Sequence, residues 1–335
     1  MNQLFNRRHM LTALAAAGVA PVVAWPVSAL ADTYPSRPVR FVNPFAPGGS
    51  ADVLSRLIAT KLGQVTGTTF FVDNVGGAGG TIGSDKVAKA SPDGYTMLLS
   101  NVAPLAIAPS LYPKLPYDPV KDFDHIALFG QFPNVLLVGP QVQAKTFAEF
   151  IAEAKSKSRG AANPFTFGSA GNGSSPHLCG ELLKLRAGIP AQHIPFKGAG
   201  PALLAVMSGE LAFQFENIST ALPQIKGGKL RAMGVTGATR SASLPDVPTM
   251  QELGLKDFVV GAWYGISAPA KTPPAMVQVI ADAVATTLAD PALQARLAEL
   301  GVEPPPVAPG KVKAYVAAEG KRWGDLIKRS GAKLD

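Results

Sequence analysis

The sequence predicts an α/β protein with two lobes and a helical C-terminal tail. Short apolar strand patterns alternate with stretches of helical periodicity along almost the whole chain, and two of the strand-to-helix turns are rich in glycine and serine. From Thr272 onward the pattern is helix after helix. Strands that alternate with helices of this length are typical of mainly parallel sheets flanked by helices, and a run of helices without new strands usually braces such a sheet.

The first 31 residues predict an export signal. The pair Arg7-Arg8 precedes an apolar run that a glycine and two prolines interrupt, so this run is too short to span a membrane. Residues 29–31, Ala-Leu-Ala, form a cleavage pattern. We expect a twin-arginine signal peptide that is cleaved after Ala31 and a periplasmic mature protein. An ordinary Sec signal that carries two arginines is the alternative.

Composition and charge exclude several classes of function. The 335-residue chain is 47% hydrophobic and has a net charge of +8, but its lysines and arginines occur mostly singly. This spacing argues against nucleic-acid binding and favours a mild attraction for small anions. Cys179 is the single cysteine, so no intramolecular disulfide forms, and we expect it to be a core residue. His125, His177 and His193 lack ligand spacing, so no metal and no cofactor is expected.

The strand and helix candidates follow one another in a regular order. Strand patterns occupy residues 39–43, 69–73, 95–100, 125–129, 135–138, 165–168, 193–196, 211–215, 230–235 and 258–266. Helical periodicity is clearest at residues 51–62, 147–154, 176–187, 199–207 and 276–288. Turn sequences such as SPDG (91–94) and IKGGK (225–229) separate these elements.

The stretch FVNPFAPGGSADVLSRLI, residues 41–58, runs from a strand through a glycine turn into a helix. A helix start offers unpaired N–H groups and the positive end of the helix dipole, so it attracts an anion without a cationic side chain. Gly48 and Gly49 leave the backbone open to a ligand. Ser50 is expected to cap the helix, and Asp52 is favoured in its first turn, where it is also placed to accept a donor from the ligand.

The stretch FTFGSAGNGSSPHLCGELL, residues 165–183, repeats this plan. Glycines at positions 168, 171 and 173 open the backbone, and Ser169 and Ser174 supply hydroxyl groups. Ser175 is expected to cap the next helix, because Pro176 would then occupy the first helical position. Each turn alone is an ordinary part of an α/β fold. Two of them, one in each half of the chain, predict a clamp that holds a carboxylate between two helix starts.

Other interpretations of these turns are weaker but stay open. Gly77, Gly79 and Gly83 miss the dinucleotide-binding spacing by one residue, and no acidic residue follows at the needed distance. Ser174 and His177 lie three residues apart, but a catalytic triad would still need a placed acid, and GSAGNGSS lacks the G-x-S-x-G pattern. A periplasmic hydrolase that uses these two residues is therefore the weaker alternative to a binding protein.

Six segments of the chain carry a resemblance to a known family. They are YPSRPVRFVNPFAPGGSADVLSR, GGAGGTIGSDKVAKASPDGYTMLLSN, YDPVKDFDHIAL, FGSAGNGSSPHLCGELL, IPFKGAGPALLAVMSGEL and GGKLRAMGVTGATRSASLPDVPTMQELGL. Over essentially the entire mature chain, the sequence resembles the substrate-binding receptors of tripartite tricarboxylate transporters, also called the Bordetella uptake gene (Bug) family. The last segment is especially specific when it follows the others at this distance.

This resemblance implies a two-lobe periplasmic binding protein, a Venus flytrap with its ligand cleft between the lobes. The chain would cross the hinge twice, with residues 32–132 and 237–335 in the first lobe and residues 133–236 in the second. Members of the family typically grip a ligand carboxylate with the two glycine turns, often through bridging water. Trp263 and Tyr264 are candidate walls of the cleft, although each alone is more typical of a core. The ligand-binding residues that the resemblance and the turns together imply are Phe45, Gly48, Gly49, Asp52, Asn101, Ser169, Gly171, Gly173, Ser174, His177, Lys197 and Asn217.

The resemblance therefore implies a monomeric receptor that delivers a small organic acid or a related metabolite to the membrane components of a tripartite transporter. A receptor that reports to a signalling partner is the alternative, because both roles need only a closed, liganded shape. The sequence departs from the family's usual pattern at Val75-Gly76, where Arg-Pro is common, and at Ala212, where an aspartate is frequent. These departures leave the identity of the ligand open.

Overall fold

The computed structural model describes residues 34–157 and 165–330. The expected signal peptide, residues 1–31, and its cleavage site after Ala31 lie outside the described residues. In the part of the chain that is described, no single helix is long and apolar enough to cross a membrane. One pair of consecutive helices, bent by 72°, passes this test of length and composition together: α8 (Pro274–Ala289) and α9 (Pro291–Glu299).

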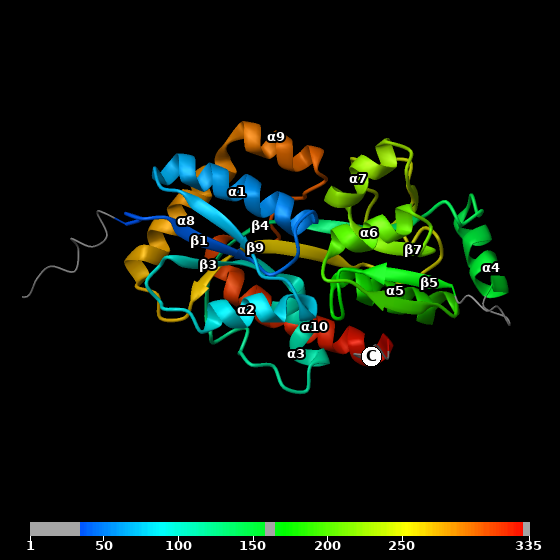
Figure 1. The fold of residues 1–335 in the computed structure, drawn as a ribbon, viewed down its shortest axis with the longest axis horizontal. Coiled ribbons are helices and arrows are strands. Elements are labelled where there is room, and N and C mark those ends of the chain that lie inside the picture. Colours follow the sequence, from blue (N-terminus) through cyan, green and yellow to red (C-terminus); the bar gives the residue numbers. More distant parts are fainter. Residues whose placement is uncertain (1–33, 158–164, 331–335) are drawn as a thin grey trace, which may run out of the picture. The chain divides into compact units, whose positions relative to one another are not determined.

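A mixed sheet of nine strands, counted over the described residues, runs through both halves of the fold (Figure 1). Its strand order is β2-β1-β3-β9-β4-β7-β5-β6, and β8 also pairs with β4. The α/β class is confirmed, and the structure refines the expected strand directions. The outer strands of each half are parallel, whereas β4 and β9 run antiparallel to their neighbours. The strands are β1 (Val39–Asn43), β2 (Phe70–Asn74), β3 (Thr96–Asn101), β4 (Phe123–Val138), β5 (Thr166–Ser169), β6 (Gln192–Pro195), β7 (Phe213–Asn217), β8 (Arg231–Val235) and β9 (Gly261–Pro269).

Helices cover both faces of the half of the sheet that contains β1, β2 and β3 (Figure 1). Helix α1 (Ser50–Thr66) packs against α8 on one face, with α9 beside them. Its apolar row, Leu54, Ile58 and Leu62, is buried as the periodicity predicts. The opposite face carries α2 (Thr81–Ala88), α3 (Ala108–Leu111) and α10 (Val312–Ser330), with short helical turns at Ala78–Gly80, Ala103–Ile107 and Pro309–Lys311.

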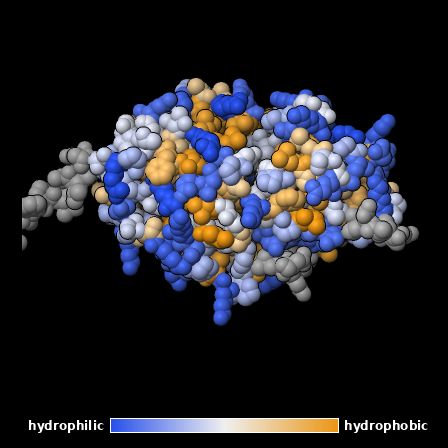
Figure 2. All heavy atoms as spheres, in the orientation of Figure 1, coloured by the Kyte–Doolittle hydropathy of each residue, from blue (hydrophilic) through white to orange (hydrophobic). Residues whose placement is uncertain are grey.

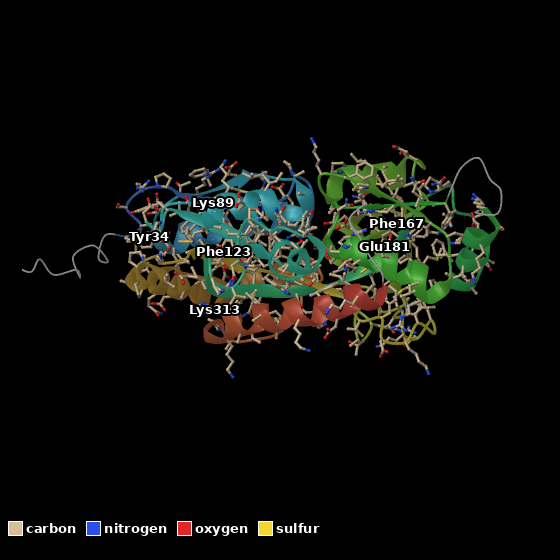
Figure 3. The ribbon with its side chains drawn as sticks, turned by 90° about the horizontal axis from the view of Figure 1, so that it is seen from below. Tyr34, Lys89, Phe123, Phe167, Glu181 and Lys313 are labelled. Carbon is tan, nitrogen blue, oxygen red and sulfur yellow. The ribbon has the colours of Figure 1, made fainter. Side chains whose placement is uncertain are left out.

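The other half of the sheet is covered in the same way. Helix α5 (Ser175–Ala187) lies on one face, and α6 (Ala199–Met207) and α7 (Ile218–Lys226) lie on the other. Phe167 stacks on Phe213 with ring centroids 5.2 Å apart in the core of this half, and Figure 3 shows Phe167 there together with Glu181 of α5. A Cβ at Gly180 would lie 2.1 Å from the Phe167 ring, so this glycine lets α5 approach the sheet. Helix α4 (Phe147–Lys157) lies at the far end (Figure 1).

The chain passes between the two halves in β4, and here the sequence-based prediction was wrong. It expected two strands, at 125–129 and 135–138, but residues 123–138 form one continuous strand. Pro133, which lacks the N–H group of a normal strand residue, lies between the two predicted strands. In the structure β4 pairs with β9 as far as Pro133, opposite Gly261, and with β7 from Asn134 onward. The strand changes partners at the proline, where the missing donor is tolerated.

The face of the molecule drawn in Figure 2 carries mostly hydrophilic residues, with hydrophobic areas scattered among them. Large apolar side chains that are exposed include Val53 on α1, Ile82 on α2 and Leu204 on α6.

Candidate functional site

A small cavity lies where the first turns of α1 and α5 meet the ends of β3 and β7 and the middle of β9. The free space at its centre is about 20 Å³, which is room for a single water molecule. Two helix starts, one from each half of the sheet, therefore face the same space. The lining residues are Phe45, Ala46, Gly49, Ser50, Ala51, Asn101, Ala103, Ala170, Ser174, Ser175, Pro176, Ala199, Glu216, Asn217 and Tyr264.

The turn before α1 keeps its open shape through the backbone. Gly48 has a φ of +90°, which favours glycine, whereas Gly49 is extended, with φ −94° and ψ 177°, and is the N-cap of α1. The prediction that Ser50 caps this helix was wrong, because the Ser50 hydroxyl instead lies 3.0 Å from the Tyr264 hydroxyl. No side chain caps α1, so the N–H groups of its first turn are left without a side-chain acceptor.

Asp52 fixes this turn from within the protein. Its carboxylate accepts hydrogen bonds from the Gly48 N–H at 3.1 Å, from Asn74 Nδ2 at 3.1 Å and from Arg56 Nε at 3.0 Å. Desolvation by burial raises the pKa of Asp52, but the hydrogen bonds from Arg56, Gly48 and Asn74 together outweigh it and hold the pKa below its usual value. The carboxylate is thus ionised, and its donors come from the turn itself, from α1 and from the end of β2.

The start of α5 has a side-chain cap. The prediction that Ser175 is its N-cap was wrong by one residue, because the N-cap is Ser174. The Ser174 Oγ accepts a hydrogen bond from the backbone N–H of His177 at 3.3 Å. Pro176 therefore stands at the second helical position instead of the first. Asparagine, aspartate, serine and threonine side chains are the common N-caps, and two adjacent serines made this boundary uncertain by one residue.

Two stacked histidines support the turn before α5 from below. His177 Nδ1 accepts a hydrogen bond from the Gly173 N–H at 3.1 Å, and the His177 ring stacks on His193 with centroids 4.1 Å apart. His193 Nε2 lies 2.7 Å from the Ser169 hydroxyl. Burial, followed by the influence of His177, lowers the pKa of His193 to about 3, so this imidazole is neutral at ordinary pH.

Direct contacts join the turn before α1 and the middle of β9 to the other half of the sheet across the cavity. Asn217 Nδ2 donates to the Ser50 hydroxyl at 2.7 Å and to the Tyr264 hydroxyl at 3.0 Å. A Cβ built on Gly49 would lie 3.0 Å from the Cβ of Ala199 at the start of α6, closer than ordinary side-chain contacts. The structure therefore shows the turn before α1 closed against the other half of the sheet, at the end of β7 and at the start of α6.

The structure divides the predicted ligand-binding residues into three groups. Those that line the cavity between the helix starts are Phe45, Gly49, Asn101, Ser174 and Asn217. Phe45, Gly171 and Lys197 line a neighbouring cavity beside the glycine-rich turn at residues 77–80. The residues that line neither of these cavities are Gly48, Asp52, Ser169, Gly173 and His177.

Glu216 was not among the predicted ligand-binding residues, although the sequence placed it beside Asn217 at the end of a strand. Glu216 is fully buried at the end of β7, lines the cavity and accepts hydrogen bonds from the Asn217 N–H at 2.9 Å and from Gln214 Nε2 at 2.5 Å. Desolvation raises its pKa to about 7, despite these two hydrogen bonds. The sequence signal for it was an acidic residue that directly follows the buried strand pattern of Phe213 and Phe215.

This arrangement serves binding better than bond cleavage. The Ser174 hydroxyl accepts from the backbone of His177, and the His177 ring accepts from Gly173, so both side chains stabilise the helix start instead of activating a nucleophile. Among the described residues there is no group of three or more His, Cys, Asp or Glu side chains that could hold a metal ion.

Comparison with known proteins decides the family. A model of the family described as "Tripartite tricarboxylate transporter family receptor" matches residues 54–332. The chain belongs to this family. Protein BugT of Bordetella pertussis is 38% identical over 313 residues, which cover 93% of this chain and 94% of BugT. The receptor family to which the chain belongs is thus the one that its six sequence segments indicated.

Solved structures of similar proteins support the same conclusion. The periplasmic binding protein BugD is 35% identical to this receptor, with a TM-score of 0.84 over 90% of this chain and 100% of BugD. Rpa4515 of R. palustris, solved with adipate, is 32% identical, with a TM-score of 0.85 over 90% of this chain and 100% of its own. MatC of Rhodopseudomonas palustris, with bound malate, is 35% identical, with a TM-score of 0.82 over 88% and 100%. The two-lobe architecture of a periplasmic solute-binding protein is therefore confirmed.

Proposed function

We propose that this receptor binds a small organic acid, with one carboxylate held between the first turns of α1 and α5. The observation that carries this proposal is the convergence of two helix starts, at Gly49 and Ser174, on one cavity. The N–H groups and dipoles of two helix starts attract one anionic group from both sides. The adipate and malate found in two similar receptors support the same ligand chemistry.

Ligand entry requires the two turns to separate. The free space of about 20 Å³ is too small for an organic acid, and Asn217 and Gly49 contact the opposite side directly. We place the hinge between residues 32–132 with 237–335 on one side and residues 133–236 on the other. The change of strand partner at Pro133 supports this division. A ligand that bridges both turns then stabilises the closed state.

The ligand class is tested by a thermal-shift screen of the purified mature receptor against small mono-, di- and tricarboxylates. A compound that binds the native state alone raises the melting temperature, by an amount that grows with the logarithm of its concentration above its dissociation constant. We expect at least one carboxylate to raise it by several degrees and the corresponding uncharged amide or ester of that carboxylate to have no effect. If the amide or ester binds as well as the acid, then the helix starts do not select a carboxylate.

The receptor's place in the cell forms part of the same proposal. The Arg7-Arg8 pair and the Ala-Leu-Ala pattern at 29–31 support twin-arginine export and cleavage after Ala31. Membership of the receptor family supports delivery of the ligand to membrane components of a tripartite transporter, and we propose that the receptor acts as a monomer. Mass spectrometry of the periplasmic fraction should give an N-terminus at Asp32. Replacing Arg7 and Arg8 by lysine should leave precursor in the cytoplasm, and normal export of this variant would indicate the Sec route instead.

A further inference from the structure

Glu216 and Asn217 form one part of the cavity lining, here called the floor, and this floor presents hydrogen-bond acceptors. Glu216 is fully buried and lines the cavity, and its two carboxylate oxygens are held by the Asn217 N–H and the Gln214 side chain. Asn217, 5% exposed, uses its Nδ2 for Ser50 and Tyr264, and its buried Oδ1 has no hydrogen-bond partner among the residues that the structure describes. A buried acceptor of this kind costs free energy until a donor satisfies it.

The charge on this floor is also uncompensated. None of the ion pairs among the described residues includes Glu216. The helix starts above it suit an anionic group, whereas a second anion beside Glu216 would be repelled. A ligand that carries N–H groups close to its carboxylate satisfies both parts of the cavity.

We propose that the preferred ligand carries an amino or amide group next to its carboxylate, and that Glu216 and Asn217 Oδ1 accept hydrogen bonds from this nitrogen. This inference rests on the proposed function, because it takes the carboxylate to lie between the helix starts. Glu216 thereby becomes the residue that distinguishes an amino acid or its amide from a plain carboxylic acid.

The proposal predicts opposite pH dependences for the two kinds of ligand. With a pKa of about 7 in the free receptor, Glu216 is ionised above pH 7 and neutral below it. An ammonium group binds best to the ionised form, so its affinity should rise between pH 5.5 and about 7 and then level off. A plain carboxylate binds best to the neutral form, so its affinity should fall above pH 7.

Other titratable groups near the cavity are controlled for by substitution. Tyr264 of β9 faces Glu216 and has a pKa raised by burial, Asp52 of α1 has a pKa lowered by its hydrogen bonds, and His177 lies at the start of α5. The part of the pH dependence that is due to Glu216 is the part that disappears in Glu216→Gln. Any dependence that remains belongs to these neighbours.

The experiment compares matched pairs of compounds by calorimetry: alanine with propionate, aspartate with succinate, and glutamate with glutarate. For the pair that binds, we expect the amino compound to bind more tightly by a factor of about 10 to 100. Glu216→Gln should remove most of this preference, because the amide is neutral and offers one acceptor. Glu210→Gln, the same change at an exposed position shortly before β7, should leave the preference intact.

Each outcome bears on a specific claim. Tight binding of succinate or glutarate with no preference for the amino compound would overturn the inference and leave the proposed carboxylate receptor standing. The inference would also be overturned if both compounds of a matched pair bind and the Glu216→Gln variant keeps the wild-type preference for the amino compound and the wild-type pH profile. If none of these acids binds while uncharged compounds do, the proposed function falls, and the inference falls with it. The wild-type pH profile provides a readout that does not depend on how well the variant folds.

Discussion

Replacing Glu319 by alanine is expected to lower the free energy of unfolding by about 3–5 kcal/mol. Glu319 lies in α10 and is 5% exposed. Its Oε2 accepts from the indole N–H of Trp263 in β9 at 3.3 Å and from that of Trp323 at 3.1 Å, and its Oε1 accepts from Arg322 at 2.7 Å. Alanine would leave two buried indole donors without an acceptor and would loosen α10 from the sheet. Urea denaturation of the ligand-free protein measures the effect.

A matched control is available on the same helix. Asp325 pairs with Lys321 at 3.4 Å, and the side chains of Lys321 and Asp325 are 83% and 57% exposed. Asp325→Ala removes an acidic side chain from α10 without uncovering a buried donor, so it should change the free energy of unfolding by less than about 0.5 kcal/mol. If Glu319→Ala is no more destabilising than Asp325→Ala, the two tryptophans do not depend on this carboxylate.

The boundaries of strands and helices that are marked by their own local sequence were predicted well. The strand at Val39–Asn43 and the helix at Ala199–Met207 were predicted with the boundaries that the structure shows, because apolar periodicity and flanking glycine or proline mark both ends. The N-caps were each misplaced by one residue, at Ser50 and Ser175, since adjacent small residues fit the cap about equally well.

Features that depend on tertiary pairing were harder to predict. The continuous strand β4 passes through Pro133 because its partner changes there, and a local pattern contains no information about that exchange. In the same way, the sequence indicated the two glycine turns but not the contacts that join the turn before α1 to the other half of the sheet. The contacts of Asn217 with Ser50 and Tyr264 join residues that are 167 and 47 positions apart. Glu216 was missed as a site residue because its burial and its position on the cavity floor follow from this assembly.

The largest effect on binding is expected from Gly49→Val. Gly49 has φ −94° and ψ 177°, a conformation open to any residue, so valine should not strain the backbone. Valine is a poorer N-cap than glycine, which should lower the stability of the ligand-free protein by about 1 kcal/mol. In the closed arrangement, however, even a Cβ at this position lies 3.0 Å from the Ala199 Cβ, and the two methyl groups of valine need more room. We therefore expect the affinity for the best carboxylate to fall by about a hundredfold or more in calorimetry, because ligand binding requires closure.

A double substitution separates closure from other effects of the new side chain. Gly49→Ala adds the single Cβ that meets Ala199, and Ala199→Gly removes its counterpart; the next atoms, the Ala199 N and Cα, lie at ordinary distances of 3.8 and 3.9 Å. Gly49→Ala alone should weaken binding by about tenfold, Ala199→Gly alone should change it little, and the pair should restore most of the affinity, which is the signature of direct coupling across the cleft. Additive losses would mean that Gly49 acts through its own turn. A Gly49→Val receptor that folds and binds its carboxylate as tightly as the wild type would show that ligand binding does not require closure at the contact between Gly49 and Ala199.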